Sequence, residues 1–280
     1  MESLVSTEWL ERELEAPDLR VIDATWCLPA DGRDPRAEYE AGHIPGAVFL
    51  DLDDVSDTAS PFPHMLPSEA KFASRMASLG LRDGQRLVVY DNSPLHSAAR
   101  GWWMLKSFGA HYVAILDGGL QKWKAEGRPL ESGRPQVRHG HFSPSLDPKA
   151  AVDKGFVAGL IGAGSHEIVD ARGAGRFTGG ESEPRPGMAS GHIPDSRNLP
   201  QGRLFESDNS WKRGDSLRAA FESAGVDLAK PMVATCGSGV TACVLLFGAR
   251  LLGKEDAQLY DGSWSEWGAD PATPKATGPA

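Results

Sequence analysis

Short apolar runs alternate with helical stretches along the whole chain. The runs are rich in valine and isoleucine, as at residues 87–91 and 231–235, and the helical stretches cover residues 68–79, 98–108, 216–224 and 240–252. Buried strands that alternate with helices predict a parallel sheet with helices on both faces, so the expected fold class is α/β. In such sheets, ligands bind at the carboxyl ends of the strands.

The chain contains the same pattern twice. Four motifs recur in the same order in both halves, namely 21–25 and 168–172, 43–47 and 192–196, 87–91 and 232–236, and 115–120 and 259–264. The offsets, taken from Asp23 to Asp170, His43 to His192, Asp91 to Cys236 and Asp117 to Asp261, are 147, 149, 145 and 144 residues. A repeat of this length indicates a duplicated domain rather than a solenoid.

The composition of two stretches predicts how the copies are joined and how the chain ends. Residues 128–148 are rich in proline and glycine, which is typical of a linker. We therefore predict a first domain at residues 1–138, a linker at 139–148 and a second domain at 149–280. The last ten residues, 271–280, are rich in proline, alanine and glycine and predict a mobile tail.

The second copy carries a cysteine where the first copy has Asp91. Cys236 follows an apolar run and opens the sequence Cys-Gly-Ser-Gly-Val-Thr, directly before a helical stretch. Glycines let the backbone fold so that successive N–H groups point at the sulfur, and the helix start adds positive potential. Such surroundings favour the thiolate, which is the nucleophilic form of cysteine. We therefore expect one active site, in the second domain.

The surroundings of each cysteine separate a reactive role from a structural one. A cysteine after a strand is usually a buried, inert side chain, and we interpret Cys27 and Cys243 in this way. The glycine-rich loop favours the reactive interpretation for Cys236. A Cys-x5-Arg phosphatase would need an arginine six positions after the cysteine, where Ala242 stands, so phosphatase chemistry is disfavoured.

Composition and charge exclude several classes of function. The net charge of −9 argues against a nucleic-acid-binding protein. No apolar run approaches the ~18 residues of a membrane-spanning helix, and the N-terminus lacks the pattern of a secretory signal. Three widely spaced cysteines suggest neither a disulfide framework nor a zinc site, and a reducing cytoplasm is the expected compartment.

The chain resembles the tandem-domain rhodaneses, and among them the 3-mercaptopyruvate sulfurtransferases. The motifs that carry the resemblance are Gly-His-Ile-Pro-Gly-Ala at 42–47, Ser-Pro at 60–61, His-Met-Leu-Pro at 64–67, Trp-Trp-Met at 102–104, Leu-Asp-Gly-Gly at 116–119, Val-Asp-Ala-Arg at 169–172, Gly-Arg-Phe at 175–177, Pro-Arg at 184–185, Gly-His-Ile-Pro at 191–194, the cysteine loop at 236–241, and residues 260–267. The resemblance implies two rhodanese-like domains, each a parallel sheet flanked by helices, of which the first is non-catalytic.

The cysteine loop and two arginines point to the donor of the sulfur. Thiosulfate-preferring rhodaneses typically carry basic residues directly after the cysteine, whereas Gly237 and Ser238 are neutral. Arg176 and Arg185 match the substrate arginines of the resembling family, and a guanidinium can bind a carboxylate through two hydrogen bonds. Without the resemblance, a solvated loop that balances nearby glutamates would be the better interpretation. The loop N–H groups are expected to stabilise the charged sulfur, with Gly237, Gly239, Val240 and Thr241 as binding residues.

Other charged residues receive structural or supporting roles. Arg172 is expected to pair with Asp170, and His192 to hold its turn by bonding to the backbone. The resemblance also implies a Ser/His/Asp arrangement that assists proton movement. Its matching residues are Ser238, His43 and one of two aspartates, Asp31 or Asp34, of which Asp34 is our choice.

These features predict a two-step sulfur transfer. The Cys236 thiolate would take sulfur from 3-mercaptopyruvate, release pyruvate, and pass the sulfur from a persulfide to cyanide or to a thiol such as thioredoxin. No metal or organic cofactor is expected, because the sulfur is carried by the protein. The alternatives are a thiosulfate sulfurtransferase and a non-catalytic rhodanese module that binds a partner.

Overall fold

The computed structural model describes residues 1–280, which form two compact units. Unit 1 comprises Met1–Asp57, Leu66–Asp147 and Phe205–Trp211, and unit 2 comprises Thr58–Met65, Pro148–Leu204 and Lys212–Ala280. The units thus follow the two sequence halves except for two short segments. Residues 58–65 of the first half belong to unit 2, and residues 205–211 of the second half belong to unit 1.

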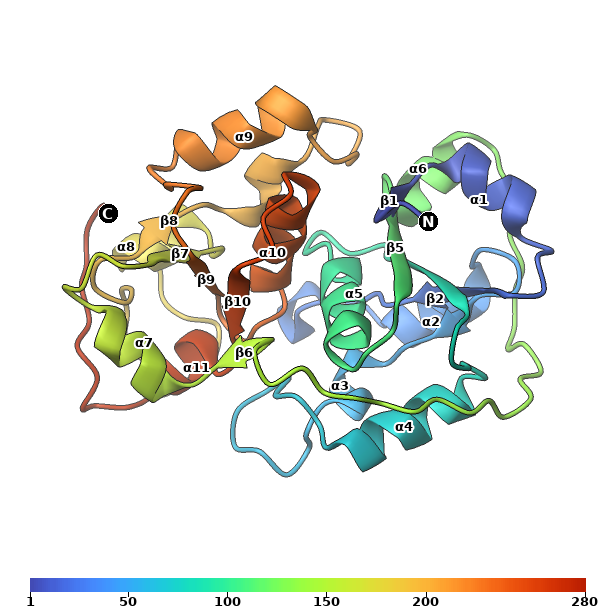
Figure 1. Cartoon of the computed structure of the whole chain (residues 1–280), viewed down its shortest axis with the longest axis horizontal. Coiled ribbons are helices and arrows are strands. Elements are labelled where there is room, and N and C mark those ends of the chain that lie inside the picture. Colours follow the sequence, from blue (N-terminus) through green and yellow to red (C-terminus); the bar gives the residue numbers. More distant parts are fainter. The chain divides into compact units, whose positions relative to one another are not determined.

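Unit 1 is built on a parallel sheet with the strand order β1-β5-β4-β2-β3. Its strands are β1 (Leu4–Val5), β2 (Leu19–Asp23), β3 (Val48–Phe49), β4 (Arg86–Tyr90) and β5 (Tyr112–Leu116). Its helices are α1 (Thr7–Glu13), the 3-10 helix η1 (Pro29–Asp31), α2 (Pro35–Ala41), α3 (Leu52–Val55), α4 (Glu69–Ser78), α5 (Ala98–Ser107) and α6 (Gly119–Ala125). Figure 1 labels most of these elements along the chain.

Unit 2 repeats this order as β6-β10-β9-β7-β8, again with all strand pairs parallel. Its strands are β6 (Ala151–Val152), β7 (Glu167–Asp170), β8 (Arg197–Asn198), β9 (Met232–Thr235) and β10 (Ala257–Tyr260). Its helices are α7 (Lys154–Leu160), α8 (Ala174–Thr178), the 3-10 helix η2 (Gln201–Leu204), α9 (Gly214–Glu222), α10 (Ala242–Leu251) and α11 (Ser263–Trp267). The identical strand order is the structural counterpart of the sequence repeat, and the expected α/β fold is confirmed.

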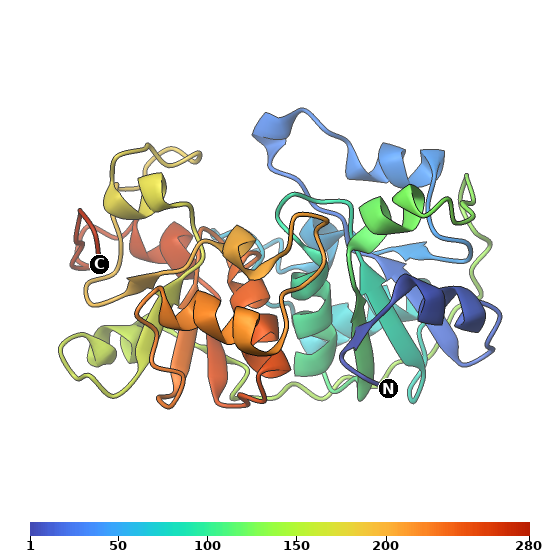
Figure 2. The same ribbon diagram turned by 90° about the horizontal axis from the view of Figure 1, so that it is seen from above.

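Helices pack on both faces of each sheet, as Figures 1 and 2 show. In unit 1, Val88 and Tyr90 of β4 belong to a buried cluster with side chains of α1, α2 and α6. The intervening Val89 faces the other side of the sheet, where α5 packs closely against it. A Cβ added to Gly101 of α5 would lie 3.1 Å from Cγ1 of Val89. Both faces of the strand are therefore buried, which explains why residues 87–90 of β4 are all hydrophobic and do not alternate with polar residues.

The same arrangement holds in unit 2. Val157 of α7 and Trp264 of α11 share a buried cluster with Val233 of β9. On the opposite face of the sheet, α10 packs against α9 and η2. The approach is close, since a Cβ added to Gly248 of α10 would lie 2.8 Å from the Leu204 side chain of η2. The sheet thus holds the start of α10 and the start of α11 beside the carboxyl end of β9.

The expectation of a mobile C-terminal tail is wrong. Ala276 and His192 exchange two backbone hydrogen bonds of 2.8 and 2.9 Å in an antiparallel bridge. The indole Nε1 of Trp267 donates to the carbonyl of Pro274 at 2.8 Å, and the amide of Gly278 donates to Thr178. The composition of residues 271–280 predicted mobility, but backbone hydrogen bonds hold this segment to the rest of unit 2. Such bonds form between main-chain groups and do not depend on side-chain type, so composition does not reveal them.

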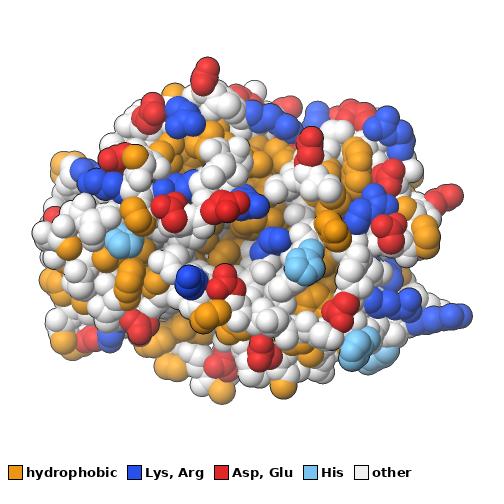
Figure 3. Space-filling view, viewed as in Figure 1, with side chains coloured by type: hydrophobic (Ala, Val, Ile, Leu, Met, Phe, Trp, Pro, Cys, Tyr) orange, Lys and Arg blue, Asp and Glu red, His pale blue; other side chains and the backbone are white.

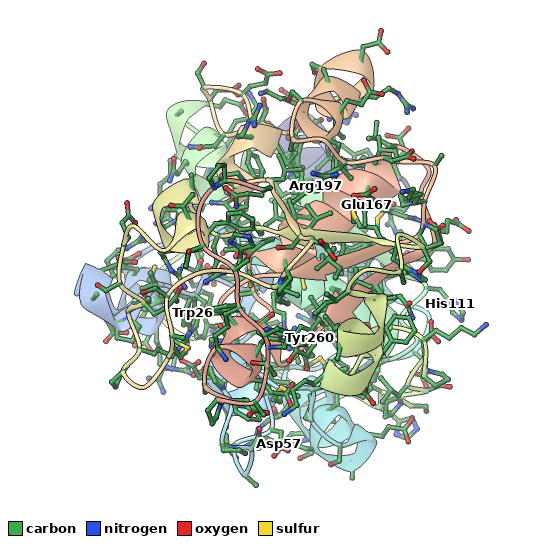
Figure 4. The ribbon with its side chains drawn as sticks, turned by 90° about the vertical axis from the view of Figure 1, so that its left-hand side faces the viewer. Trp26, Asp57, His111, Glu167, Arg197 and Tyr260 are labelled. Atoms are coloured by element: carbon green, nitrogen blue, oxygen red, sulfur yellow. The ribbon has the colours of Figure 1, made fainter.

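The surface carries charges of both signs. Acidic and basic side chains are interspersed over the face drawn in Figure 3. At the amino end of the unit 2 sheet, Glu167 lies beside Arg197 in Figure 4, with 3.8 Å between Oε2 and Nε. None of the helices is both long enough and apolar enough to cross a membrane.

Candidate functional site

Cys236 lies at the carboxyl end of β9, in the loop that leads into α10. Its side chain is buried, with a relative exposure of 2%. Gly239 has a φ of +78°, a left-handed conformation that favours glycine and turns the loop towards the helix. The loop N–H groups at Val240 and Thr241 immediately precede α10 and have no carbonyl partner within it, because the first turn of any helix leaves such donors unused. The predicted strand, loop and helix are therefore present around this cysteine.

The start of α11 fixes the peptide planes that follow Cys236. The Trp264 amide donates to the Cys236 carbonyl at 3.0 Å, and the Ser265 amide donates to the Gly237 carbonyl at 2.9 Å. The Ser265 hydroxyl donates to the same Gly237 carbonyl at 2.6 Å. In a trans peptide the N–H points opposite to the carbonyl, so the amides of Gly237 and Ser238 point away from α11. These two N–H groups are thus held in place to stabilise negative charge.

Ser238 has a histidine partner within unit 2. Its Oγ lies 2.8 Å from Nδ1 of His64, and both side chains are buried. His64 has a φ of +63°, which is uncommon for a non-glycine residue, so the segment at 58–65 holds it in a strained conformation. The serine predicted from the sequence therefore has a hydrogen-bonded imidazole, which comes from His64 and not from the predicted His43.

The structure places His43 and both candidate aspartates in unit 1, where each has a local hydrogen-bond partner. His43 is fully buried in unit 1, where Nδ1 bonds the Tyr39 carbonyl at 2.8 Å and the ring stacks on Tyr39 at 4.1 Å. Asp34 caps the start of α2 by accepting from the Ala37 amide at 3.1 Å. Asp31 accepts from a backbone amide of its own turn, that of Leu28. All three residues serve local structure.

The sequence repeat explains why His43 has a structural role. Its counterpart His192 makes the same contacts in unit 2, with Nδ1 2.8 Å from the Phe177 carbonyl and the ring stacked on Phe177 at 3.8 Å. In both copies, the histidine of the His-Ile-Pro motif therefore connects the turn before a strand to the preceding helix. The feature that could have singled out His64 is its own motif, His-Met-Leu-Pro at 64–67, which has no counterpart among the four repeated motifs.

Both predicted arginines reach the residue after Cys236. Arg176 lies on α8, and Arg185 lies on the loop that follows this helix. A Cβ added to Gly237 would lie 3.1 Å from Nη2 of Arg176 and 3.9 Å from Nη1 of Arg185. Two guanidinium groups thus meet beside the cysteine loop, although neighbouring loop residues carry no charge. This convergence supports the functional interpretation of the arginines over the solvated-loop one.

A buried ion-pair chain runs from the end of β7 to Arg176. Arg172 binds Asp170 through Nε and Nη2, with a shortest distance of 2.7 Å, as sequence analysis expected. Its Nη2 also donates to the Gly191 carbonyl at 2.8 Å, and its Nη1 donates to Glu183 at 2.6 Å. Glu183 in turn accepts from Nη2 and Nε of Arg176. Apart from Arg176, whose side chain is 22% exposed, these charged side chains are 1% exposed.

Gly237→Ala is expected to weaken donor binding. The new Cβ would sit 3.1 Å from Arg176, closer than ordinary contact, so the guanidinium must shift by a few tenths of an ångström. Misplacing a binding group costs rate, and we expect the donor KM to rise about three- to tenfold. The matched control is Gly159→Ala, whose Cβ would meet nothing within 4 Å. Equal donor saturation curves for the two variants would contradict this geometry.

The equivalent place in unit 1 contains no nucleophile. Asp91 follows β4, and its carboxylate accepts from the amides of Ala98 at 2.6 Å and Ser93 at 2.9 Å. The cavity beside it measures about 20 Å³, roughly the space of one water molecule. Phe205 and Trp211 help to line it. Asp91 thus occupies the position that Cys236 has in the second copy, and backbone amides bind its carboxylate there.

The family model described as a rhodanese-like domain matches the chain at residues 6–126 and again at 155–270. A 3-mercaptopyruvate sulfurtransferase of Mus musculus is 44% identical over 95% of this chain and 91% of the relative. A thiosulfate sulfurtransferase of Cricetulus griseus is 42% identical, also over 95% of this chain and 91% of the relative. The crystal structure of the 3-mercaptopyruvate sulfotransferase SseA from Escherichia coli superposes with a TM-score of 0.87 at 40% identity, and covers 95% of this chain and 100% of SseA. Both halves of the chain thus match the rhodanese-like family model, and nearly the whole chain is similar to these known proteins.

Proposed function

The chain belongs to the rhodanese-like family, and we propose that it transfers sulfur from 3-mercaptopyruvate through a persulfide on Cys236. The observation that carries this proposal is the convergence of Arg176 and Arg185 on Gly237, directly beside the cysteine. Two guanidinium groups suit the carboxylate and keto oxygens of an α-keto acid. The relatives named above for this donor support the same choice.

In the first half-reaction, the Cys236 thiolate attacks the thiol sulfur of 3-mercaptopyruvate. A sulfur–sulfur bond forms while the carbon–sulfur bond breaks, and its electron pair leaves with the carbon fragment as the enolate of pyruvate. The enolate takes up one proton at carbon and departs as pyruvate. The amides of Gly237 and Ser238 stabilise the charged sulfur, while the arginines hold the carboxylate and the developing enolate oxygen.

Ser238 and His64 form the group that we assign to proton movement. Their 2.8 Å hydrogen bond places an imidazole behind a hydroxyl in the loop that carries the nucleophile. An imidazole can accept and donate a proton and can relay it through the hydroxyl. Since His43 bonds a backbone carbonyl in unit 1, this role passes to His64.

In the second half-reaction, a thiol or cyanide attacks the outer sulfur of the persulfide and restores the Cys236 thiolate. A protein dithiol of the thioredoxin type is our proposed acceptor, because it can reduce the persulfide and release the sulfur as sulfide. None of the three cysteines of the chain forms a disulfide. A reducing cytoplasm is the compartment that we propose.

Thiosulfate is the second candidate donor, because a relative of nearly equal similarity is named for it. It is a dianion and would also be attracted by the two arginines. Steady-state rates with each donor and a common acceptor discriminate between the two, together with the mass of the intact protein. We expect the wild type to gain one sulfur from 3-mercaptopyruvate and to prefer it over thiosulfate. A clear preference for thiosulfate would overturn the choice of donor.

Arg185→Ala is expected to raise the donor KM about 10- to 100-fold, which is the effect of losing a charge-assisted hydrogen bond. The acceptor KM should stay unchanged, since Arg185 faces the donor carboxylate. Arg218→Ala, which removes an exposed arginine from α9, is the matched control. An unchanged donor saturation curve for Arg185→Ala would remove this residue from the site.

A further inference from the structure

Glu183 is a buried acid for which the sulfur-transfer steps have no use. Its side chain is 1% exposed and carries a charge beside the residues that would bind an anionic donor. A carboxylate at this place repels the substrate, and burying it is costly unless it is paired and fully hydrogen-bonded. Its position therefore needs an explanation beyond charge balance.

The two carboxylate oxygens of Glu183 are divided between two arginines. Oε1 accepts from Nη1 of Arg172 at 2.6 Å. Oε2 accepts from Nη2 of Arg176 and from its Nε at 3.2 Å. The edge of the Arg176 guanidinium formed by Nε and Nη2 is thereby bound to Glu183, and the same Nη2 would lie 3.1 Å from a Cβ added to Gly237. Nη2 carries two N–H groups, so it can bind Glu183 with one and a donor with the other. Glu183 thus fixes the position of the Arg176 nitrogen that lies beside the cysteine loop.

Arg172 supplies the fixed end of this connection. It is bound to Asp170 at the end of β7, and its guanidinium carbon lies 4.4 Å from the ring centroid of Trp264. Trp264 also donates its backbone amide to the Cys236 carbonyl. The same rigid group therefore supports both the cysteine loop and, through Glu183, the donor-binding arginine.

We propose that Glu183 is a positioning residue that sets the orientation of Arg176 towards the donor carboxylate. This inference rests on the proposed function, since it assigns Arg176 to the donor. Two roles of Glu183, orienting Arg176 and reducing the positive potential, lead to opposite predictions for donor binding once the carboxylate is removed. If the carboxylate merely reduces the positive potential, its removal should strengthen the binding of an anionic donor. If it orients Arg176, its removal should weaken that binding despite the gain in positive charge.

The test compares donor saturation for the wild type, Glu183→Gln, Glu183→Asp and Glu181→Gln. Glutamine keeps the shape but not the charge, and aspartate keeps the charge but is too short to span both guanidinium groups. We expect both Glu183 variants to raise the KM for 3-mercaptopyruvate about tenfold, with a smaller change in kcat. Glu181→Gln removes an equal charge from an exposed residue of the same loop and should leave KM unchanged.

Two further readouts separate positioning from a general loss of structure. The acceptor KM, and the fraction of protein that gains one sulfur at saturating donor, should both match the wild type. An unchanged or lower donor KM in both Glu183 variants would overturn the inference, and Glu183→Asp decides if Glu183→Gln does not fold. A wild type that gains no sulfur from 3-mercaptopyruvate would instead refute the proposed function, so the two failures are distinguishable.

Discussion

Cys236→Ser is expected to abolish sulfur transfer and the gain of one sulfur by the protein. A serine oxygen cannot form the persulfide, and a hydroxyl is a far weaker nucleophile than a thiolate at neutral pH. Loss of the nucleophile should lower kcat by roughly 10⁴- to 10⁶-fold, as for other enzymes that work through a covalent intermediate. Pyruvate release and intact-protein mass after incubation with 3-mercaptopyruvate measure the two effects independently.

Cys243→Ser is the matched control for that experiment. Cys243 is fully buried in α10, and its Sγ donates to the Gly239 carbonyl at 3.1 Å, a bond that a serine hydroxyl can also make. This variant should keep the sulfur gain and most of the activity. If Cys236→Ser still acquired sulfur, or if Cys243→Ser lost that ability, Cys236 would not be the carrier.

Asp91 is expected to make the stability of the folded protein depend on pH. Burial raises the pKa of this carboxyl to about 7, against the lowering effect of the hydrogen bonds from Ala98 and Ser93. An unfolded aspartate has a pKa near 3.9, so between about pH 4 and 7 the folded protein holds a proton that the unfolded chain releases. The contribution of Asp91 is therefore fully present below about pH 4 and is lost as the pH rises through 7. A difference of roughly three pH units corresponds to about 4 kcal/mol.

Chemical denaturation of the wild type and Asp91→Asn from about pH 4 to pH 8 measures this contribution. Asparagine cannot ionise, so the variant should gain about 4 kcal/mol relative to the wild type across this range. The loss of one hydrogen bond from a backbone amide changes the free energy of unfolding of the variant by an amount that does not depend on pH. Parallel stability curves for the two proteins would show that Asp91 titrates as an ordinary carboxyl.

Much of the site followed from local sequence. The loop at 236–241 is contiguous, and an apolar strand, two glycines and a helix start sufficed to identify Cys236. Arg172 and Asp170 are two residues apart in the sequence, so their ion pair could be predicted in the same way. Arg176 and Arg185 needed the family resemblance, because charge and spacing alone favoured a solvated loop. These residues share a feature that a sequence can show, namely a motif around each of them.

The partner of Ser238 did not follow from sequence. His64 precedes Ser238 by 174 residues, in a segment that leaves the first half of the chain to join unit 2. The resemblance directed attention to His43, a histidine that recurs in the second copy as His192. Recurrence in both copies, however, marks a need of the fold, whereas a residue that serves one active site should occur once. The duplication thus favours a structural role for His43, whereas the resemblance matched this residue to the Ser/His/Asp arrangement.

The amino-acid sequence alone predicted the α/β fold class, the duplication, the proposed nucleophile Cys236 and its replacement by Asp91 in the first copy. Periodicity, repeated motifs and short contiguous loops encode these features through local physical preferences. Only the tertiary structure decided that His64 contacts Ser238, that Glu183 joins Arg172 to Arg176, and that the last residues pair with His192. Each of these contacts joins segments separated along the chain, and it forms because packing around the sheet brings together groups whose hydrogen bonds and charges must be satisfied once buried.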